Sequence, residues 1–392
     1  MHRGRQGQGS RVAVLAVVTI LVGGLAQAAY GAKPPKPDAA DAALDRAVQK
    51  LVQTTGGPPA AIAVVQRGDE VKAHAAGVAD VTTGTPPAVD DHVRLASVSK
   101  AFSGAVALAL VADGTLSLGD TIGKRLPTLP KAWKNVTLAQ ALQHTSGIPD
   151  FATSKGWTDA VNAAPLQPPA SPAELLSYVQ DKALAFEPGS AYRYSQSDNI
   201  VVGLMVEAAT SRPYEDVLQE RVFGPLALTG TSLPRDAAMP TPYVHGYTVV
   251  PPNPPQDLSE GVAMGWLWAT AGIVSTPAEV NRFVRGYATG ATTNKATATK
   301  QFRFRTGTSD VTGPGANAAG LGIYRYGTRC GTVYGHTGTV PGYTTFVAAT
   351  RDGTRSTTVS VNAQISPAKG KQHFPALRKI FELATCAALA GT

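Results

Sequence analysis

Strand-like segments stand at both ends of this chain and enclose about two hundred residues with a mostly helical pattern. Near the N-terminus, residues 60–66 and 70–77 flank a Gly-containing turn and predict a β-hairpin. From about residue 319, four more strand-like segments follow, and residues 377–384 repeat apolar side chains at helical spacing. We expect both ends to join in one antiparallel sheet flanked by terminal helices, with an inserted all-helical lobe: an α/β plus α architecture. The cleft between the lobes is the expected site.

The first 28 residues have the pattern of a signal peptide. Three arginines within residues 1–11 precede an apolar stretch over 12–25, and a small-residue cleavage site follows at 26–28. The alternative is a membrane anchor, but the stretch is too short to span a bilayer comfortably and a Pro-rich segment follows it. We therefore expect a secreted, extracellular protein of the cell-wall space with no membrane span after cleavage.

The rest of the chain divides where the pattern changes. We expect a linker over 29–40 and an α/β lobe made of residues 41–96 and 291–392. The mostly helical lobe is expected over 97–290. No internal repeat interrupts this order.

Charge and metal-ligand spacing exclude two classes of function. The formal net charge is +8, and removal of residues 1–28 with their three arginines leaves +5. No dense Lys/Arg patch with interleaved aromatic residues occurs, so we expect no nucleic-acid partner. The sequence has no Cys-x-x-Cys and no His-Glu-x-x-His, so we expect no metal and no cofactor. We expect a monomer.

The chain has two cysteines, Cys330 and Cys386. In an exported protein an even count predicts a disulfide between them. The alternative is a pair of buried thiols.

The segment RLASVSKAFSG carries Ser97 and Lys100 three residues apart at the start of an apolar run. Residues at this spacing lie on one face of a helix, and a Ser in the first turn lies at the positive end of the helix dipole. A buried Lys with a lowered pKa can take the Ser proton. The alternative for Ser97 is a helix N-cap. A second such pair, Ser366 and Lys369, contains a Pro and opens no apolar helix.

Two further segments, YRYSQSDN over 192–199 and YGHTGTVPGY over 334–343, give the Ser-Lys pair a context. Three ordered boxes result: Ser97-x-x-Lys100, Tyr194-x-Gln196 and His336-Thr337-Gly338. This set resembles the penicillin-recognising serine hydrolases, which include class C β-lactamases, related esterases and D-Ala-D-Ala peptidases. LQHTSG over 142–147 is also typical of that family, and the resemblance covers about residues 40–388.

The third box, with the segment that begins at Cys330, most resembles the soluble, secreted D-alanyl-D-alanine carboxypeptidases. In those enzymes a Cys also precedes the box and a second Cys lies near the C-terminus. The resemblance implies a penicillin-sensitive carboxypeptidase that trims peptidoglycan stem peptides through an acyl-enzyme on Ser97. Its ligands would be a stem peptide or a β-lactam. The alternatives are a β-lactamase or esterase on the same fold, or a protein that binds penicillin or wall peptide without turnover.

The resemblance also implies a role for each catalytic residue. Ser97 is the expected nucleophile, and either Lys100 or Tyr194 is the expected base. His336 stands where other members have Lys and would relay a proton to the leaving amine or polarise Tyr194. A protonated His336 and Lys100 would favour the Tyr194 phenolate.

Substrate contacts follow from the same likeness. Thr337 and Thr339 would bind the terminal carboxylate of the substrate, beside Gly338, and the backbone N–H groups of Ser97 and Thr339 would form the oxyanion hole. Trp268 is a further candidate for substrate binding.

Two positions depart from the family pattern. The second box ends in Gln196 where Asn is usual, so either Gln196 or the nearby Asp198 or Asn199 would hold a substrate amide. The carboxypeptidases also place an Arg on the strand before the third box. Alignment by the shared Cys puts that Arg on Tyr324, and a small bulge would be needed to bring Arg325 into the cleft.

Overall fold

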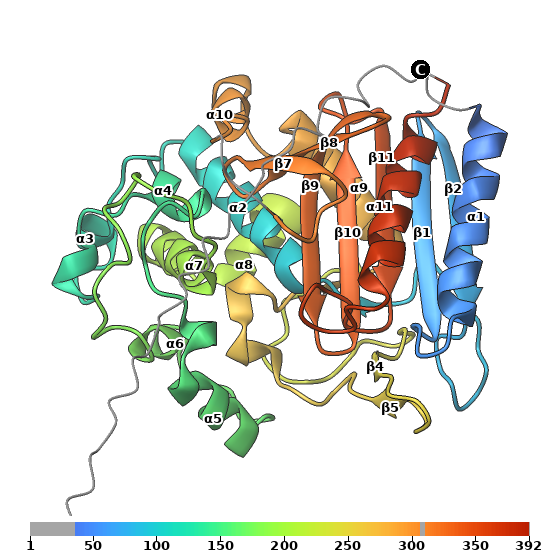
Figure 1. Cartoon of the computed structure of the whole chain (residues 1–392). Helices are drawn as coiled ribbons and strands as arrows, with labels where there is room; N and C mark the ends of the chain where they lie inside the picture. The colour runs from blue at the N-terminus through green and yellow to red at the C-terminus, as the bar shows by residue number, and fades with distance from the viewer. Residues whose placement is uncertain (1–35, 306–309, 392) are drawn as a thin grey trace, which may run out of the picture.

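The computed structural model describes residues 36–305 and 310–391 (Figure 1). The expected signal peptide over 1–28 lies outside the described residues. The expected linker over 29–40 is wrong at its end, because helix α1 already begins at Pro37, a residue whose fixed φ suits the first helical position.

A seven-stranded antiparallel sheet forms the core of one lobe, in the order β2-β1-β11-β10-β9-β8-β7. Its strands are β1 Ala60–Arg67, β2 Glu70–Gly77, β7 Ala316–Ala319, β8 Tyr324–Thr328, β9 Gly331–Val340, β10 Tyr343–Ala349 and β11 Arg355–Val361. The pairing of β1 with β11 joins the two ends of the chain, with Ala61 opposite Val361. The predicted single sheet is therefore confirmed.

Helices cover both faces of this sheet. The terminal helices α1 (Pro37–Gln53) and α11 (Phe374–Ala388) lie side by side on one face (Figure 1). Helix α9 (Pro277–Thr289) packs on β10 and β11 from the other side. Because both faces are covered, every residue of β1 is buried. The contacts of α9 place it in the sheet lobe, so the helical lobe ends before residue 277 rather than at the expected 290.

The helical lobe is built around two largely buried helices, α2 (Ser99–Ala112) and α7 (Gln196–Thr210). Shorter helices surround them: α3 Ile122–Arg125, α4 Leu138–Leu142, α5 Lys155–Ala163, α6 Glu174–Ser177 and α8 Tyr214–Leu218. The remaining elements are α10 Lys295–Gln301 and two short pairs, β3 Val93–Arg94 with β6 Val274–Ser275 and β4 Tyr247–Thr248 with β5 Gln256–Asp257. Within the described ranges, no helix is long and apolar enough to cross a membrane.

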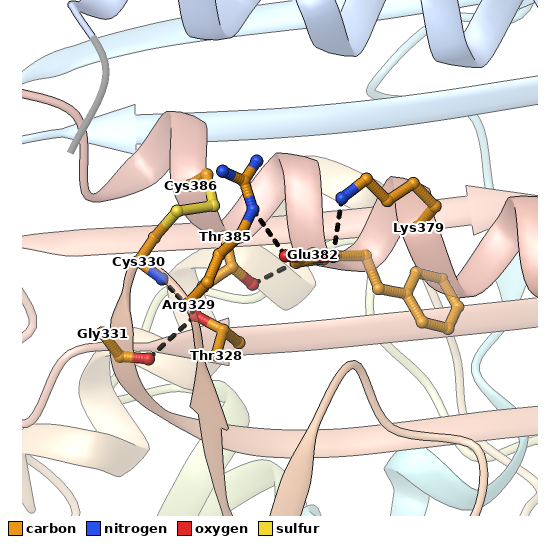
Figure 2. Close-up of a disulfide and its surroundings, with 9 residues drawn as sticks. Thr328, Arg329, Cys330, Gly331, Lys379, Glu382, Thr385 and Cys386 are labelled. Atoms are coloured by element: carbon orange, nitrogen blue, oxygen red, sulfur yellow. Dashed lines mark hydrogen bonds and ion pairs between the residues drawn. A yellow bond between two sulfur atoms is a disulfide. The ribbon is translucent and has the colours of Figure 1, made fainter. Parts of the chain in front are cut away.

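The disulfide predicted from the cysteine count is present between Cys330 and Cys386, with a Cα–Cα distance of 5.2 Å. It ties the β8–β9 turn to α11 (Figure 2). Beside it, Arg329 Nε lies 2.6 Å and Lys379 Nζ 2.9 Å from the Glu382 carboxylate. This end of the sheet is thus held by one covalent bond and a small surface network.

Reduction of this disulfide should destabilise the fold. The bridge spans 56 residues, so its loss restores chain entropy to the unfolded state worth about 4 kcal/mol. For a chain of this size that corresponds to a decrease in Tm of about 5 °C, measurable by thermal unfolding with and without reductant. The double variant Cys330→Ser/Cys386→Ser should unfold like the reduced protein and ignore reductant. An equal Tm in both redox states would contradict the prediction.

Candidate active site

The turn that carries Ser97 is conformationally unusual. Ala96 adopts the left-handed region with φ of 51°, which costs a non-Gly residue free energy and is common where a structure fixes a functional group. A short 3₁₀ turn over Ala96–Val98 then leads into α2. Ser97 is therefore presented at the N-terminal end of a buried helix, where the helix dipole favours developing negative charge.

Strand β9 lies against this turn with almost no space between the backbones. A Cβ atom added at Gly338 would lie 2.3 Å from the carbonyl O of Leu95 and 2.9 Å from the backbone N of Ser97. Such distances leave no room for any side chain, so glycine is required at this position. The contact brings the sheet and the helical lobe together at Ser97.

The same strand offers a free N–H group beside Ser97. Val340 pairs with Tyr343 across a two-residue turn, so alternate residues from Val340 direct their N–H groups toward β10. Thr339 is adjacent to Val340 in the strand, so its N–H points to the opposite edge of β9. Strand β8 does not occupy that edge, because its pairing with β9 ends at Gly335. The N–H groups of Ser97 and Thr339 are thus available for an oxyanion.

Lys100 lies one turn along α2 and is almost fully buried. Its Nζ is 3.1 Å from Ser97 Oγ, 2.5 Å from Gln196 Oε1 and 2.9 Å from the carbonyl O of Thr270. A neutral amine can donate two N–H groups to Gln196 and Thr270 while its lone pair accepts the Ser97 proton. The arrangement therefore suits Lys100 as a base.

A cavity of about 280 Å³ opens over Ser97. Residues of the three predicted boxes form part of its walls, and the sequence did not indicate Asp310, Val311 and Thr312. The full lining is Ser97, Tyr192, Tyr194, Gln196, Asp310, Val311, Thr312, Tyr324, His336, Thr337, Gly338 and Thr339. The boxes, widely separated in sequence, thus meet at one site. Among the described residues, no group of three His, Cys, Asp or Glu side chains could hold a metal ion.

A family model described as Beta-lactamase matches residues 44–381. The chain belongs to the beta-lactamase family.

One curated protein and two solved structures illustrate the similarity of this chain to known proteins. A D-aminopeptidase of Brucella anthropi is 32% identical over 201 residues, which cover 50% of this chain and 37% of that protein. The match therefore spans well under two thirds of that relative. Among solved structures, a D-stereospecific amidohydrolase from a Streptomyces species has a TM-score of 0.74 at 24% identity, over 86% of this chain and 98% of that one. A D-amino acid amidase from Ochrobactrum anthropi SV3 has a TM-score of 0.75 at 21% identity, over 88% and 98%. At these identities the structural likeness shows the fold.

Burial controls the ionisation of Lys100 in this beta-lactamase family member. Desolvation lowers the pKa of its amine to about 7, and the charges of Asp150 and Asp198 offset only part of that effect. Without the protein, a Lys amine has a pKa near ~10.4. A large fraction of Lys100 is therefore neutral at pH 7 and able to accept a proton.

The expectation of a Tyr194 phenolate beside a protonated His336 is wrong. Burial raises the pKa of the Tyr194 phenol well above its usual value, although a hydrogen bond with Ser97 lowers it in part. Burial also lowers the pKa of His336 to about 4, and its Nδ1–H donates to the carbonyl O of Thr337 at 2.5 Å. Both side chains are neutral at pH 7, because burial disfavours the phenolate of Tyr194 and the imidazolium of His336.

Gln196 uses its extra methylene to reach two partners. Its Oε1 accepts hydrogen bonds from Lys100 Nζ and from the Thr270 hydroxyl. Thr270, which no sequence motif indicated, thus contacts the site through both its carbonyl and its hydroxyl. The alternative role for Asp198 does not hold, since that residue is fully buried away from the cavity and pairs with His144 Nδ1 at 2.9 Å.

The structure corrects the expectations for Arg325 and Trp268. Arg325 is exposed on the opposite face of β8 from Tyr324, which lines the cavity, and no bulge shifts this register. Its guanidinium lies 5.2 Å from the centre of the Phe304 ring. Trp268 is fully buried behind the site, and its Nε1–H donates to Glu215 at 2.8 Å. Neither side chain lines the cavity over Ser97.

Replacement of Gly338 by Ala should disrupt the site. The added methyl would overlap the carbonyl O of Leu95, so β9 must move away from the nucleophile turn. We expect a lower Tm and a decrease of about 100-fold in the rate of Ser97 acylation by a chromogenic cephalosporin, because misplacement by 1 Å has effects of that order. Gly119→Ala is the matched control, since the nearest atom to its new methyl is 3.8 Å away. Acylation of the Gly338 variant at the parent rate would contradict the prediction.

Acylation of Ser97 should increase with pH through about 7. Below that pH Lys100 is protonated and cannot accept the Ser97 proton, so the rate falls tenfold per unit; above it the rate is constant. The measurement is the pH profile of kcat/KM. Tyr194→Phe should lower the constant value of kcat/KM at high pH. The decrease of kcat/KM below pH 7 should remain, because Tyr194 is not the titrating group. If kcat/KM no longer decreased below pH 7 in this variant, the base would be Tyr194 instead.

Proposed function

We propose that this protein is an active-site serine amidohydrolase that cleaves amide bonds of D-amino-acid derivatives through an ester on Ser97. The observation that carries the proposal is the 3.1 Å contact between Ser97 Oγ and Lys100 Nζ, an amine whose pKa burial lowers to about 7. The relatives named as a D-aminopeptidase and as D-amino-acid amidohydrolases support the choice of substrate class.

The residues at the site suffice for both halves of an acyl transfer. Lys100 accepts the Ser97 proton as Oγ attacks the carbonyl carbon, and the two N–H groups stabilise the oxyanion. The neutral phenol of Tyr194, hydrogen-bonded to Ser97, can donate its proton to the leaving amine and be reprotonated from Lys100. Water then attacks the ester by the reverse proton path and frees Ser97.

The D-alanyl-D-alanine carboxypeptidase expected from the sequence is a narrower form of this reaction. The hydroxyls of Thr337 and Thr339, which line the cavity, favour it as a second candidate. A free substrate carboxylate next to the scissile bond also needs a cation, and Arg325, the expected one, faces away. We therefore place amide hydrolysis of D-amino-acid derivatives before carboxypeptidase activity, and β-lactamase or esterase turnover after both.

We also propose that the protein is exported. The Cys330–Cys386 bridge supports this proposal, because structural disulfides persist in oxidising compartments. The basic and apolar pattern of residues 1–28 agrees with it.

Labelling with a fluorescent penicillin tests the nucleophile. The label should attach to Ser97, and Ser97→Ala should abolish it and lower kcat on a D-amino-acid amide more than about 1000-fold. Ser366→Ala is the matched control from the second Ser-x-x-Lys pair, where the Ser366 hydroxyl only accepts N–H groups of its own turn. Label on any other Ser, or full activity without Ser97, would refute the proposal.

Substrate preference needs a direct comparison on one preparation. The expected order of kcat/KM is D-alanine p-nitroanilide, then N-acetyl-D-Ala-D-Ala, then a chromogenic cephalosporin. Faster turnover of the D-Ala-D-Ala peptide would return the function to carboxypeptidase, and labelling without turnover of any substrate would make this a binding protein.

A further inference from the structure

Asp310 places a carboxylate in the wall of the cavity over Ser97, although it belongs to none of the three boxes. Its Oδ2 accepts hydrogen bonds from the hydroxyl of Thr337 at 2.8 Å and of Tyr326 at 2.7 Å. Its Oδ1 accepts the backbone N–H of Thr312 at 2.9 Å and the Thr312 hydroxyl at 2.5 Å. Four neutral donors thus fix the position of this carboxylate.

The charge of Asp310 is close enough to act on the reaction centre. It raises the pKa of His336, which opposes the larger effect of burial. It also raises the pKa of Tyr194, in the same direction as burial. The hydroxyls of Thr312 and Thr337 also contact each other at 2.5 Å, and both residues line the cavity together with Asp310. The anion is therefore both near the site and accessible to a ligand that donates hydrogen bonds.

In the part of the chain that the structure describes, no cationic side chain lines the cavity beside this carboxylate. Among the described residues that line it, none is Lys or Arg, and His336 is neutral at pH 7. Lys100 lies behind Ser97 and is held by Gln196 and Thr270. A substrate carboxylate on Thr337 would meet the carboxylate of Asp310 at a distance where like charges repel.

We propose that Asp310 is a substrate-binding residue that selects a free α-ammonium group next to the scissile amide. This inference rests on the proposed function and narrows it to amides and peptides with an unblocked N-terminal D-residue. The ammonium donates to Asp310 and the threonine hydroxyls, which fixes the substrate carbonyl over Ser97. The charge of the cavity is thus opposite to the one that a carboxypeptidase requires.

The test compares D-alanine p-nitroanilide with its N-acetyl derivative, which lacks the positive charge. The parent protein should prefer the free amine by about 10- to 100-fold in kcat/KM, as expected for a charge-assisted hydrogen bond. In Asp310→Asn this ratio should fall to within about threefold of unity. The matched control Asp159→Asn, which removes an exposed carboxylate paired with Lys155, should keep the parent ratio.

The pH dependence of the same ratio tests the idea in the parent protein alone. The preference should decrease above about pH 8, where an α-amine loses its proton, and should not change in Asp310→Asn. Penicillin labelling of Ser97 reports folding and acyl transfer separately. If labelling fails, the proposed function falls; if labelling succeeds but the parent shows no preference for the amine, or Asp310→Asn keeps it, the inference alone is overturned.

Discussion

The close approach of β9 to the Ser97 turn is the constraint on which the rest of the site depends. One strand of the sheet contacts the first turn of a helix from the other lobe without a side chain between them, at Gly338. This contact puts two N–H groups from different lobes side by side. One turn further along that helix, Lys100 Nζ contacts Ser97 Oγ, Gln196 Oε1 and the carbonyl O of Thr270.

The loss of solvent around Lys100 explains the chemistry of the whole cavity. A buried amine without a carboxylate partner is more stable in its neutral form, and the same desolvation keeps Tyr194 and His336 uncharged. Asp310 differs in its surroundings, because it accepts hydrogen bonds from the Thr312 N–H and from the hydroxyls of Thr312, Tyr326 and Thr337. The site therefore combines groups whose charged forms burial disfavours with one carboxylate that is held by hydrogen bonds.

Much of this arrangement could be predicted from sequence, for reasons that differ between its parts. The β-hairpin, the four C-terminal strands and the terminal helices follow from local periodicity, and the three boxes follow from resemblance. Periodicity could not assign α9 to the sheet lobe, because the pattern of an amphipathic helix shows which face is buried but not which element packs against that face. Strand alternation did place Tyr324 rather than Arg325 toward the cavity. Thr270 and Asp310 were not predictable, since each reaches the site only through tertiary packing.

The pairing of β1 with β11 also determines when the site can form. Ala61 and Val361 are neighbours in the sheet but lie 300 positions apart in the chain. Pairing over such a separation closes a very long loop, and topologies with many non-local contacts fold slowly. Until β11 is in place, β1 and β10 present unpaired edges of the kind that bind to other strands. The turn that carries Ser97 lies early in the sequence, but the cavity over it is assembled only when the C-terminal strands have joined the sheet.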